Sequence, residues 1–111
     1  MPTKEQVFES LDGIKRKFDD PSLKESFKGF KREIQFKFSD LNVEYVLSIN
    51  EDASATLKEG VVEKPNIVVE MDSATFLGIR NKTISPTQAY MSGKLKVKGA
   101  MPDLLKLQRL L

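Results

Sequence analysis

The side chains that most often carry out chemistry in proteins are scarce in this sequence of 111 residues. It contains no histidine and no cysteine, which excludes a Ser-His-Asp triad, a cysteine nucleophile, a redox cysteine pair and every ordinary zinc site. The carboxylate pairs Asp19-Asp20 and Glu51-Asp52 fall at expected helix ends and turns, and the glycines never form a phosphate-binding loop. No catalytic residue, metal or cofactor is therefore predicted, although a small hydrolase using a lone tyrosine, lysine or carboxylate stays open as a remote alternative.

Apolar residues near the C-terminus are better candidates for a functional site. A helix is predicted from Pro102 to the end of the chain, and on a helical wheel its leucines cover an arc of roughly 220°, wider than packing against one sheet requires. These leucines are Leu104, Leu105, Leu107, Leu110 and Leu111. Such a helix either packs in a tight core or a dimer contact, or it packs on the sheet and also lines a ligand cavity.

Gln108 falls inside this apolar arc, between Leu104 and Leu105. A buried amide needs a hydrogen-bond partner, and cavities for apolar ligands commonly carry one or two placed polar groups. Gln108 is therefore predicted to face a cavity, unless it bonds a backbone carbonyl or reaches solvent at a frayed helix end. Met91 and Met101 lie nearby, and methionine adapts to irregular surfaces, although core filling is the simpler interpretation.

Charge is distributed unevenly along the chain. Residues 82–111 hold six basic side chains and one acidic, whereas residues 39–81 hold three basic and eight acidic. A basic end beside an apolar helix suits transient contact with an anionic membrane surface, but a solvated strand face is the simpler interpretation. Nucleic acid is not expected as a partner, because the basic residues lack interleaved aromatics and no recognition motif is present.

The candidate residues must be positioned by helices that lie at both ends of the chain. Helices are predicted from Thr3 to Asp19, Ser22 to Lys28, Ser73 to Arg80, Ser85 to Gly93, and Pro102 to the C-terminus. Ser22 with Glu25 is interpreted as a capping box, and Ser85 before Pro86 as another helix start.

Between the helices the apolar residues alternate with period two, which predicts strands. These cover residues 33–38, 43–49, 53–58, 67–71 and 94–99. Short turns at 40–42 and 50–52 join the first three strands into an antiparallel meander. The predicted fold class is α/β: a single five-stranded, mostly antiparallel sheet, apolar on one face and covered there by helices.

Length and composition favour one domain over residues 1–111. No apolar stretch approaches the roughly 18 residues of a membrane span, and the N-terminus does not have the pattern of a signal peptide. The cytoplasm is therefore the expected location.

Four short motifs follow one another in the last part of the chain. They are acid-x-x-x-Phe-Leu at 72–77, Pro-x-x-Ala-aromatic at 86–90, Gly-Lys-Leu-x-Val-x-Gly at 93–99 and Leu-x-Leu-Gln at 105–108. Together the residues from Met71 to Leu111 resemble the sterol carrier protein type 2 family of lipid-binding domains. The resemblance implies helices that enclose an apolar tunnel with the sheet, and binding of fatty acyl chains, acyl-CoA, sterols or phospholipids without a cofactor. Met91 stands where many members have a second aromatic, so the family's sterol preference is not carried over.

The sequence thus predicts a non-enzymatic protein that binds, and in one version transfers, hydrophobic ligands. The predicted lining residues are Phe76, Leu77, Met91, Met101, Leu104, Leu105 and Gln108. One alternative is an interaction module or homodimer that uses the same C-terminal surface. Another is an accessory factor that presents lipid or quinone intermediates to an enzyme in trans.

Overall fold

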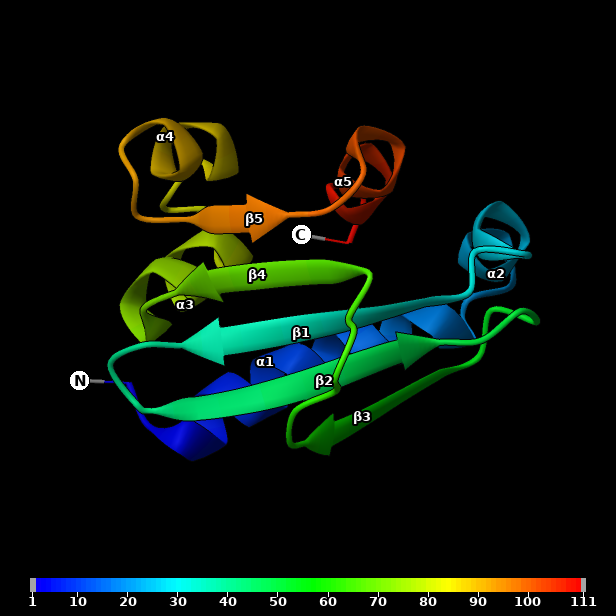
Figure 1. Ribbon diagram of the computed structural model, residues 1–111, viewed down its shortest axis with the longest axis horizontal. Helices are drawn as coiled ribbons and strands as arrows, with labels where there is room; N and C mark the ends of the chain where they lie inside the picture. The colour runs from blue at the N-terminus through cyan, green and yellow to red at the C-terminus, as the bar shows by residue number, and fades with distance from the viewer. Residues whose placement is uncertain (1, 111) are drawn as a thin grey trace.

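The protein, described by a computed structural model over residues 2–110, is built on one five-stranded sheet in the order β3-β2-β1-β4-β5 (Figure 1). The strands are β1 (Arg32–Phe38), β2 (Val43–Ile49), β3 (Ala55–Glu59), β4 (Ile67–Met71) and β5 (Lys96–Lys98). The helices are α1 (Lys4–Arg16), α2 (Pro21–Phe27), α3 (Ser73–Arg80), α4 (Pro86–Met91) and α5 (Met101–Leu107), with a 3-10 turn at Lys17–Asp19.

The sheet is mostly antiparallel, as predicted. β1 pairs with β2, β2 with β3 and β4 with β5 in antiparallel register, and only β1 and β4 run parallel. The parallel pair requires a crossover, and residues 60–66 make it by passing over the open face of β2 and β1 (Figure 1). Gln35 holds this crossover, because its side-chain amide donates to the Gly60 carbonyl at 2.9 Å and its amide oxygen accepts from the Val62 N–H at 3.0 Å.

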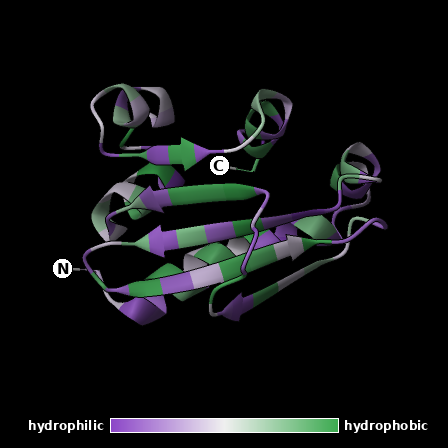
Figure 2. Ribbon diagram, viewed as in Figure 1, coloured by the Kyte–Doolittle hydropathy of each residue, from purple (hydrophilic) through white to green (hydrophobic). Residues whose placement is uncertain are grey.

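The core lies on the other face of the sheet, which α1 and α3 cover (Figure 1). Val7, Leu11 and Ile14 follow one another at helical spacing along α1 and are fully buried. The apolar positions of the strands meet them, and Figure 2 shows the strands alternating between hydrophobic and hydrophilic residues. The alternation that predicted the strands is therefore the pattern of a sheet with one face packed on the core, although Gln35 and Val46 on the other face are buried as well.

The second helix and the third strand differ from their predicted bounds. α2 begins one residue earlier, with Pro21 at its first position and Asp20 as its cap, whose carboxylate accepts from the Ser22 N–H at 2.9 Å. The predicted Ser22 capping box was wrong, because proline suits the first helical position and leaves the cap to the residue before it. β3 begins at Ala55, since Ala53 adopts a left-handed φ of 66° and closes a turn that a strand cannot contain.

The last helix is shorter than predicted. α5 ends at Leu107, Gln108 is its C-cap, and Leu110 follows in a turn and is still fully buried. The wheel, which assumed a helix to the end of the chain, therefore applies to three of its five leucines; Leu111 lies outside the described residues. Within residues 2–110, no helix is both long enough and apolar enough to cross a membrane.

Candidate functional site

The candidate site is at the corner of the molecule formed by α4, β5 and α5, residues 86–108, which we call the corner. Ser85 caps α4 by accepting a hydrogen bond from the Gln88 N–H at 3.4 Å, and the helix ends where Gly93 takes a φ of 81°. The N–H groups of Lys94 and Leu95 then both donate to the Ala89 carbonyl, at 2.9 and 3.0 Å. This reversal places Leu95 beneath α4 and leads the chain into β5.

β5 and α5 are placed by contacts to the sheet and to α2. Val97 is opposite Val69 in β4. Gly99, with a φ of 158°, then turns the chain towards α5. A Cβ at position 99 would come within 3.2 Å of the Asn66 carbonyl oxygen, so glycine suits this turn. Helices α4 and α5 therefore lie towards the two ends of β5, both beyond the edge of the sheet (Figure 1).

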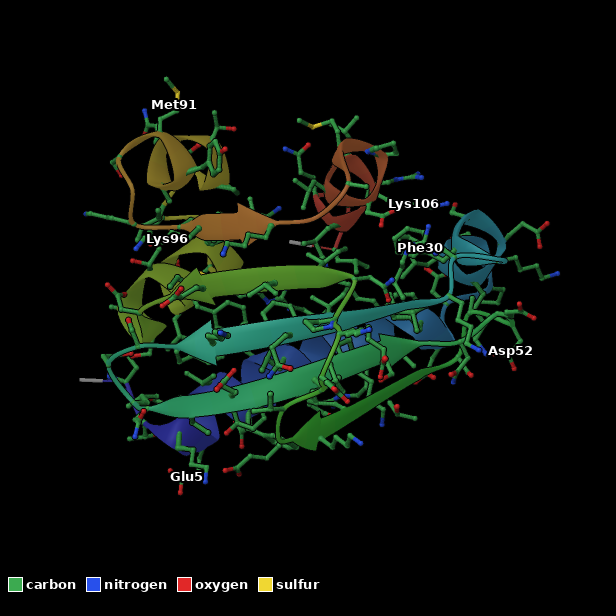
Figure 3. The ribbon with its side chains drawn as sticks, viewed as in Figure 1. Glu5, Phe30, Asp52, Met91, Lys96 and Lys106 are labelled. Atoms are coloured by element: carbon green, nitrogen blue, oxygen red, sulfur yellow. The ribbon has the colours of Figure 1, made fainter. Side chains whose placement is uncertain are left out.

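Charged contacts anchor α5 to the rest of the protein. The Asp103 carboxylate, mostly buried, forms an ion pair with the Arg32 guanidinium at 2.9 Å. The Lys106 ammonium lies 5.2 Å from the centre of the Phe27 ring and 5.3 Å from that of Phe30, and Figure 3 shows Lys106 beside Phe30. Both distances are within the range of a cation–π contact, so these contacts and the buried Leu107 hold one side of α5 to the core.

A pocket of about 210 Å³ lies between the two helices, over β5. It is lined by Pro86, Thr87, Tyr90, Leu95, Val97, Met101, Leu104, Leu105, Leu107 and Gln108. None of these residues is a carboxylate, a lysine or an arginine. The buried Leu95 and Leu107 contribute to its interior, whereas Tyr90 and Leu105 are more than half exposed at its mouth. The pocket is therefore apolar, uncharged and open on one side.

The perturbed ionisable groups lie elsewhere. Burial, followed by repulsion from Arg80 and Lys82, lowers the pKa of Lys17. Lys17 donates a hydrogen bond at 3.0 Å to the carbonyl of Leu110, whose side chain is buried in the core. Across residues 2–110 no three carboxylates gather as metal ligands would. The geometry of the corner thus provides a place for an apolar molecule and no assembled group of reactive side chains.

The structure brings together four of the seven residues predicted from the sequence. Met101, Leu104, Leu105 and Gln108 all line the pocket. Gln108 is exposed at the helix end, so the prediction of a buried amide was wrong. Its side chain reaches solvent, which was the alternative.

The other three predicted residues lie outside the pocket lining. Phe76 is fully buried in the core, with its ring centre 5.2 Å from that of Phe38. Leu77 is half-buried on α3, and Met91 is 80% exposed at the end of α4. Figure 3 shows Met91 pointing away from the sheet.

Sequence reasoning missed six of the lining residues: Pro86, Thr87, Tyr90, Leu95, Val97 and Leu107. All of them fall within the motifs at 86–90, 93–99 and 105–108. The signal that could have found them was that these three motifs are consecutive in the chain and therefore build one corner.

An uncharged apolar pocket on the edge of an α/β sheet defines a domain suited to holding hydrophobic molecules. Residues 11–111 match the model of the SCP-2 sterol transfer family, and the chain belongs to that family of lipid-binding domains. It is 32% identical over 106 residues to hydroxysteroid dehydrogenase-like protein 2 of Xenopus laevis, covering 84% of this chain and 25% of that protein. The chain thus spans about a quarter of the length of this relative and of its Xenopus tropicalis counterpart.

Solved structures share the fold over nearly the whole chain. Sterol carrier protein 2 like 2 of Aedes aegypti superimposes with a TM-score of 0.71 and 18% identity, covering 95% of both chains; a palmitated form of that protein is also similar, with a TM-score of 0.67. The ubiquinone synthesis protein UbiJ-SCP2 has a TM-score of 0.67 and 16% identity, covering 99% of this chain and 92% of that one. At these identities the likeness concerns the fold.

Proposed function

We propose that this protein binds and carries hydrophobic molecules that contain an acyl chain, in the pocket between α4, β5 and α5. The observation that carries the proposal is an apolar, uncharged pocket in a chain of the SCP-2 sterol transfer family. The protein performs no chemistry on the ligand: it removes the ligand from water and releases it elsewhere. The palmitated Aedes aegypti structure supports an acyl ligand.

The size of the pocket favours a narrow ligand. Its volume of about 210 Å³ exceeds the roughly 150 Å³ of an engineered cavity that holds benzene. It is below the roughly 300 Å³ at which pockets for drug-sized ligands begin. Part of an acyl chain fits such a space without rearrangement, whereas a whole sterol requires the helices to separate.

The lining suggests how the ligand lies. Leu95, Val97 and Leu107 form an apolar interior, while the polar groups of Thr87 and Gln108 are on exposed residues. We propose that the chain end enters towards β5 and that the headgroup stays near Thr87 and Gln108. The proposed site therefore keeps Met101, Leu104, Leu105 and Gln108 and adds the residues of α4 and β5.

Burial supplies the affinity. Each methylene moved from water to an apolar site contributes about 0.8 kcal/mol, so a chain of about ten carbons gains roughly 8 kcal/mol before ordering costs. That gross value sets micromolar affinity as about the upper limit, because the ordering costs reduce it.

Titration with a fluorescent fatty acid tests the proposal. Leu104→Gln places an amide in the wall of the pocket, and we expect affinity to fall about tenfold because apolar contact is lost. Val61→Gln is the matched control, since Val61 is a 68% exposed aliphatic residue on the crossover, and it should bind like the parent. Equal affinity of a folded Leu104→Gln variant and the parent would place the ligand elsewhere.

A second candidate function is that of an accessory factor that presents a lipid or quinone intermediate to an enzyme in trans. The similarity to UbiJ-SCP2 over 99% of this chain favours it. Native mass spectrometry of the freshly purified protein distinguishes the two: a bound fatty acid or phospholipid supports the carrier, and a bound prenylated ring compound supports the accessory factor.

Domain organisation, location and assembly complete the proposal. We expect residues 1–111 to resist limited proteolysis as one domain and to fractionate with the cytoplasm. The remaining alternative is a homodimer that forms through the corner. Sedimentation velocity measures the oligomeric state, and a tight dimer without an accessible pocket would support this alternative.

A further inference from the structure

We propose that the groove between the start of α1 and the strands β2 and β3 binds the guanidinium group of an arginine side chain from a partner protein. We call it the acidic groove; it has a volume of about 380 Å³ and is lined by Lys4, Glu5, Phe8, Glu9, Tyr45 and Glu59. Because β3 and β5 are the two edge strands of the sheet, the acidic groove and the corner lie at opposite edges. The inference therefore does not depend on the proposed function.

Negative charge is in excess in the acidic groove. Three carboxylates line it, and Lys4 is its one cation, which leaves two negative charges in a chain whose overall charge is +2. The Lys4 ammonium lies 2.9 and 3.1 Å from the two carboxylate oxygens of Glu59. Among the ion pairs of residues 2–110, none includes Glu5 or Glu9. The groove therefore attracts cations from outside the chain.

The requirements of the fold account for one of the two unpaired carboxylates. Glu5 is in the first turn of α1, where the helix dipole favours a negative charge, and Figure 3 shows it at the outer edge of the protein. Glu9 is one turn further on, beyond the reach of that effect. Like charges four residues apart destabilise a helix slightly. A cation bound between Glu5 and Glu9 would offset this repulsion.

A buried tyrosine presents an unpartnered hydroxyl to the acidic groove, which is a second and independent observation. Tyr45 is only 1% exposed, and its ring centre is 6.3 Å from that of Phe38 in the core. Burial, followed by the charge of Glu59, raises the pKa of the hydroxyl, while the charge of Lys4 opposes the rise. Between residues 2 and 110 this hydroxyl has no hydrogen-bond partner. Since buried hydroxyls normally have one, it is available to a ligand.

An exposed aromatic ring beside the carboxylates favours one kind of cation. Phe8 is 40% exposed, and its ring centre is 5.7 Å from that of Tyr45, with the planes inclined by 54°. A guanidinium stacks on an aromatic face and directs N–H donors from its edge to carboxylate and hydroxyl oxygens. An ammonium is a strongly hydrated point charge that does not stack, and a quaternary ammonium has no N–H to donate to the hydroxyl. The groove therefore suits arginine.

Amide NMR of the full chain tests the proposal during titration with a capped alanine–arginine–alanine peptide. The signals of Phe8, Glu9 and Glu59 should shift together and saturate. The same peptide with lysine in place of arginine should bind roughly threefold more weakly, because it lacks the stacking contact. Agmatine, a small molecule with a guanidinium group, should bind no more tightly than the arginine peptide.

Two variants separate binding from folding. Tyr45→Phe keeps the ring and removes the hydroxyl, so affinity should fall roughly threefold to tenfold. The midpoint of thermal unfolding should not fall, because the hydroxyl makes no hydrogen bond in the free protein. Glu9→Gln should weaken binding roughly twofold to fivefold. The matched controls, Tyr90→Phe in the corner and Glu63→Gln on the crossover, are both at exposed residues and should bind like the parent.

The outcomes that would overturn the inference are distinct. Equal affinity for the arginine and lysine peptides would mean that charge alone explains binding. Unchanged affinity of Tyr45→Phe, or equal losses in Glu9→Gln and Glu63→Gln, would place the peptide outside the acidic groove. Binding of agmatine without binding of the peptide would assign the groove to a small molecule. Each of these results leaves fatty-acid binding at the corner, and with it the proposed function, unaffected.

Discussion

The body of the protein, formed by β1 to β4 with α1 and α3, differs sharply from the corner. In the body, strands β1, β2 and β4 and helix α1 each bury several side chains, and only the edge strand β3 buries none. In the corner, α4 buries only Ala89, β5 buries none of its three residues, and α5 buries Asp103 and Leu107. The apolar residues of the corner are thus partly free of protein contacts.

This difference separates the source of stability from the site of binding. A closely packed interior has no room for a ligand, and every buried side chain in the body already has protein neighbours. In the corner, a molecule that covers the exposed apolar residues would remove their surface from water, which is favourable. The body holds the fold, and the corner, anchored at a few points, provides the proposed surface for hydrophobic molecules.

The largest expected effect comes from Phe76, which resemblance placed at the ligand and the structure places in the body. Its fully buried ring lies 5.2 Å from that of Phe38 and 6.3 Å from that of Phe36, measured between centres. Phe76→Ala should lower the free energy of unfolding by about 3–5 kcal/mol, because a large cavity remains. Chemical denaturation measures this loss.

Leu105→Ala is the matched change in the corner. The side chain is 58% exposed, so the variant should stay within about 1 kcal/mol of the parent. Similar losses for the two variants would remove the distinction between body and corner.

The next effect concerns the anchor between the two regions. Asp103→Asn keeps the shape of the side chain but removes the charge that pairs with Arg32 at 2.9 Å. Because the pair is partly exposed, we expect a loss of roughly 1–2 kcal/mol. The loss should be local, so amide hydrogen exchange should accelerate at Leu107 and Gln108 and not in α1. Faster exchange throughout the chain would mean that the corner unfolds with the body.

The smallest effect is acid destabilisation of the body. Burial disfavours the ionised Asp40 carboxylate, but hydrogen bonds from the Ser73 hydroxyl and N–H, and from the N–H groups of Asp40 and Leu41, outweigh it and lower the pKa below 3.8. The resulting stability is fully present above pH 3.8 and is lost as the pH falls through the lower, folded value. Denaturation curves at a series of acidic pH values should show this loss in the parent and a smaller one in Asp40→Asn.

The body could be predicted from sequence because its pattern is local and regular. Period-two alternation in Ile34, Phe36 and Phe38 arises from a sheet with one buried face, and the structure confirms it. The local patterns did not predict the exact bounds of α2 and β3, which depend on the conformations of single neighbouring residues. Pro21 moved the start of α2, and Ala53 took a left-handed conformation within a turn.

The candidate site was harder to predict because a helical wheel assumes that the helix continues. α5 ends at Leu107, so Gln108 became a cap at the pocket mouth. Whether Phe76 or Leu104 reaches the pocket depends on how α3 and α5 pack on the sheet, which no spacing along the chain contains. The motifs indicated the segment that lines the pocket, but which of its side chains reach the pocket depends on tertiary packing.

The most direct test of the central claim is methyl NMR during titration with a fatty acid. Binding between α4, β5 and α5 predicts that the methyl signals of Leu95, Val97 and Leu104 shift together and saturate at one ligand per chain. Those of Val7 and Val46, which are buried in the body and beneath the crossover, should stay in place. Shifts confined to methyl groups outside the corner, or no saturable shift at all, would contradict the account.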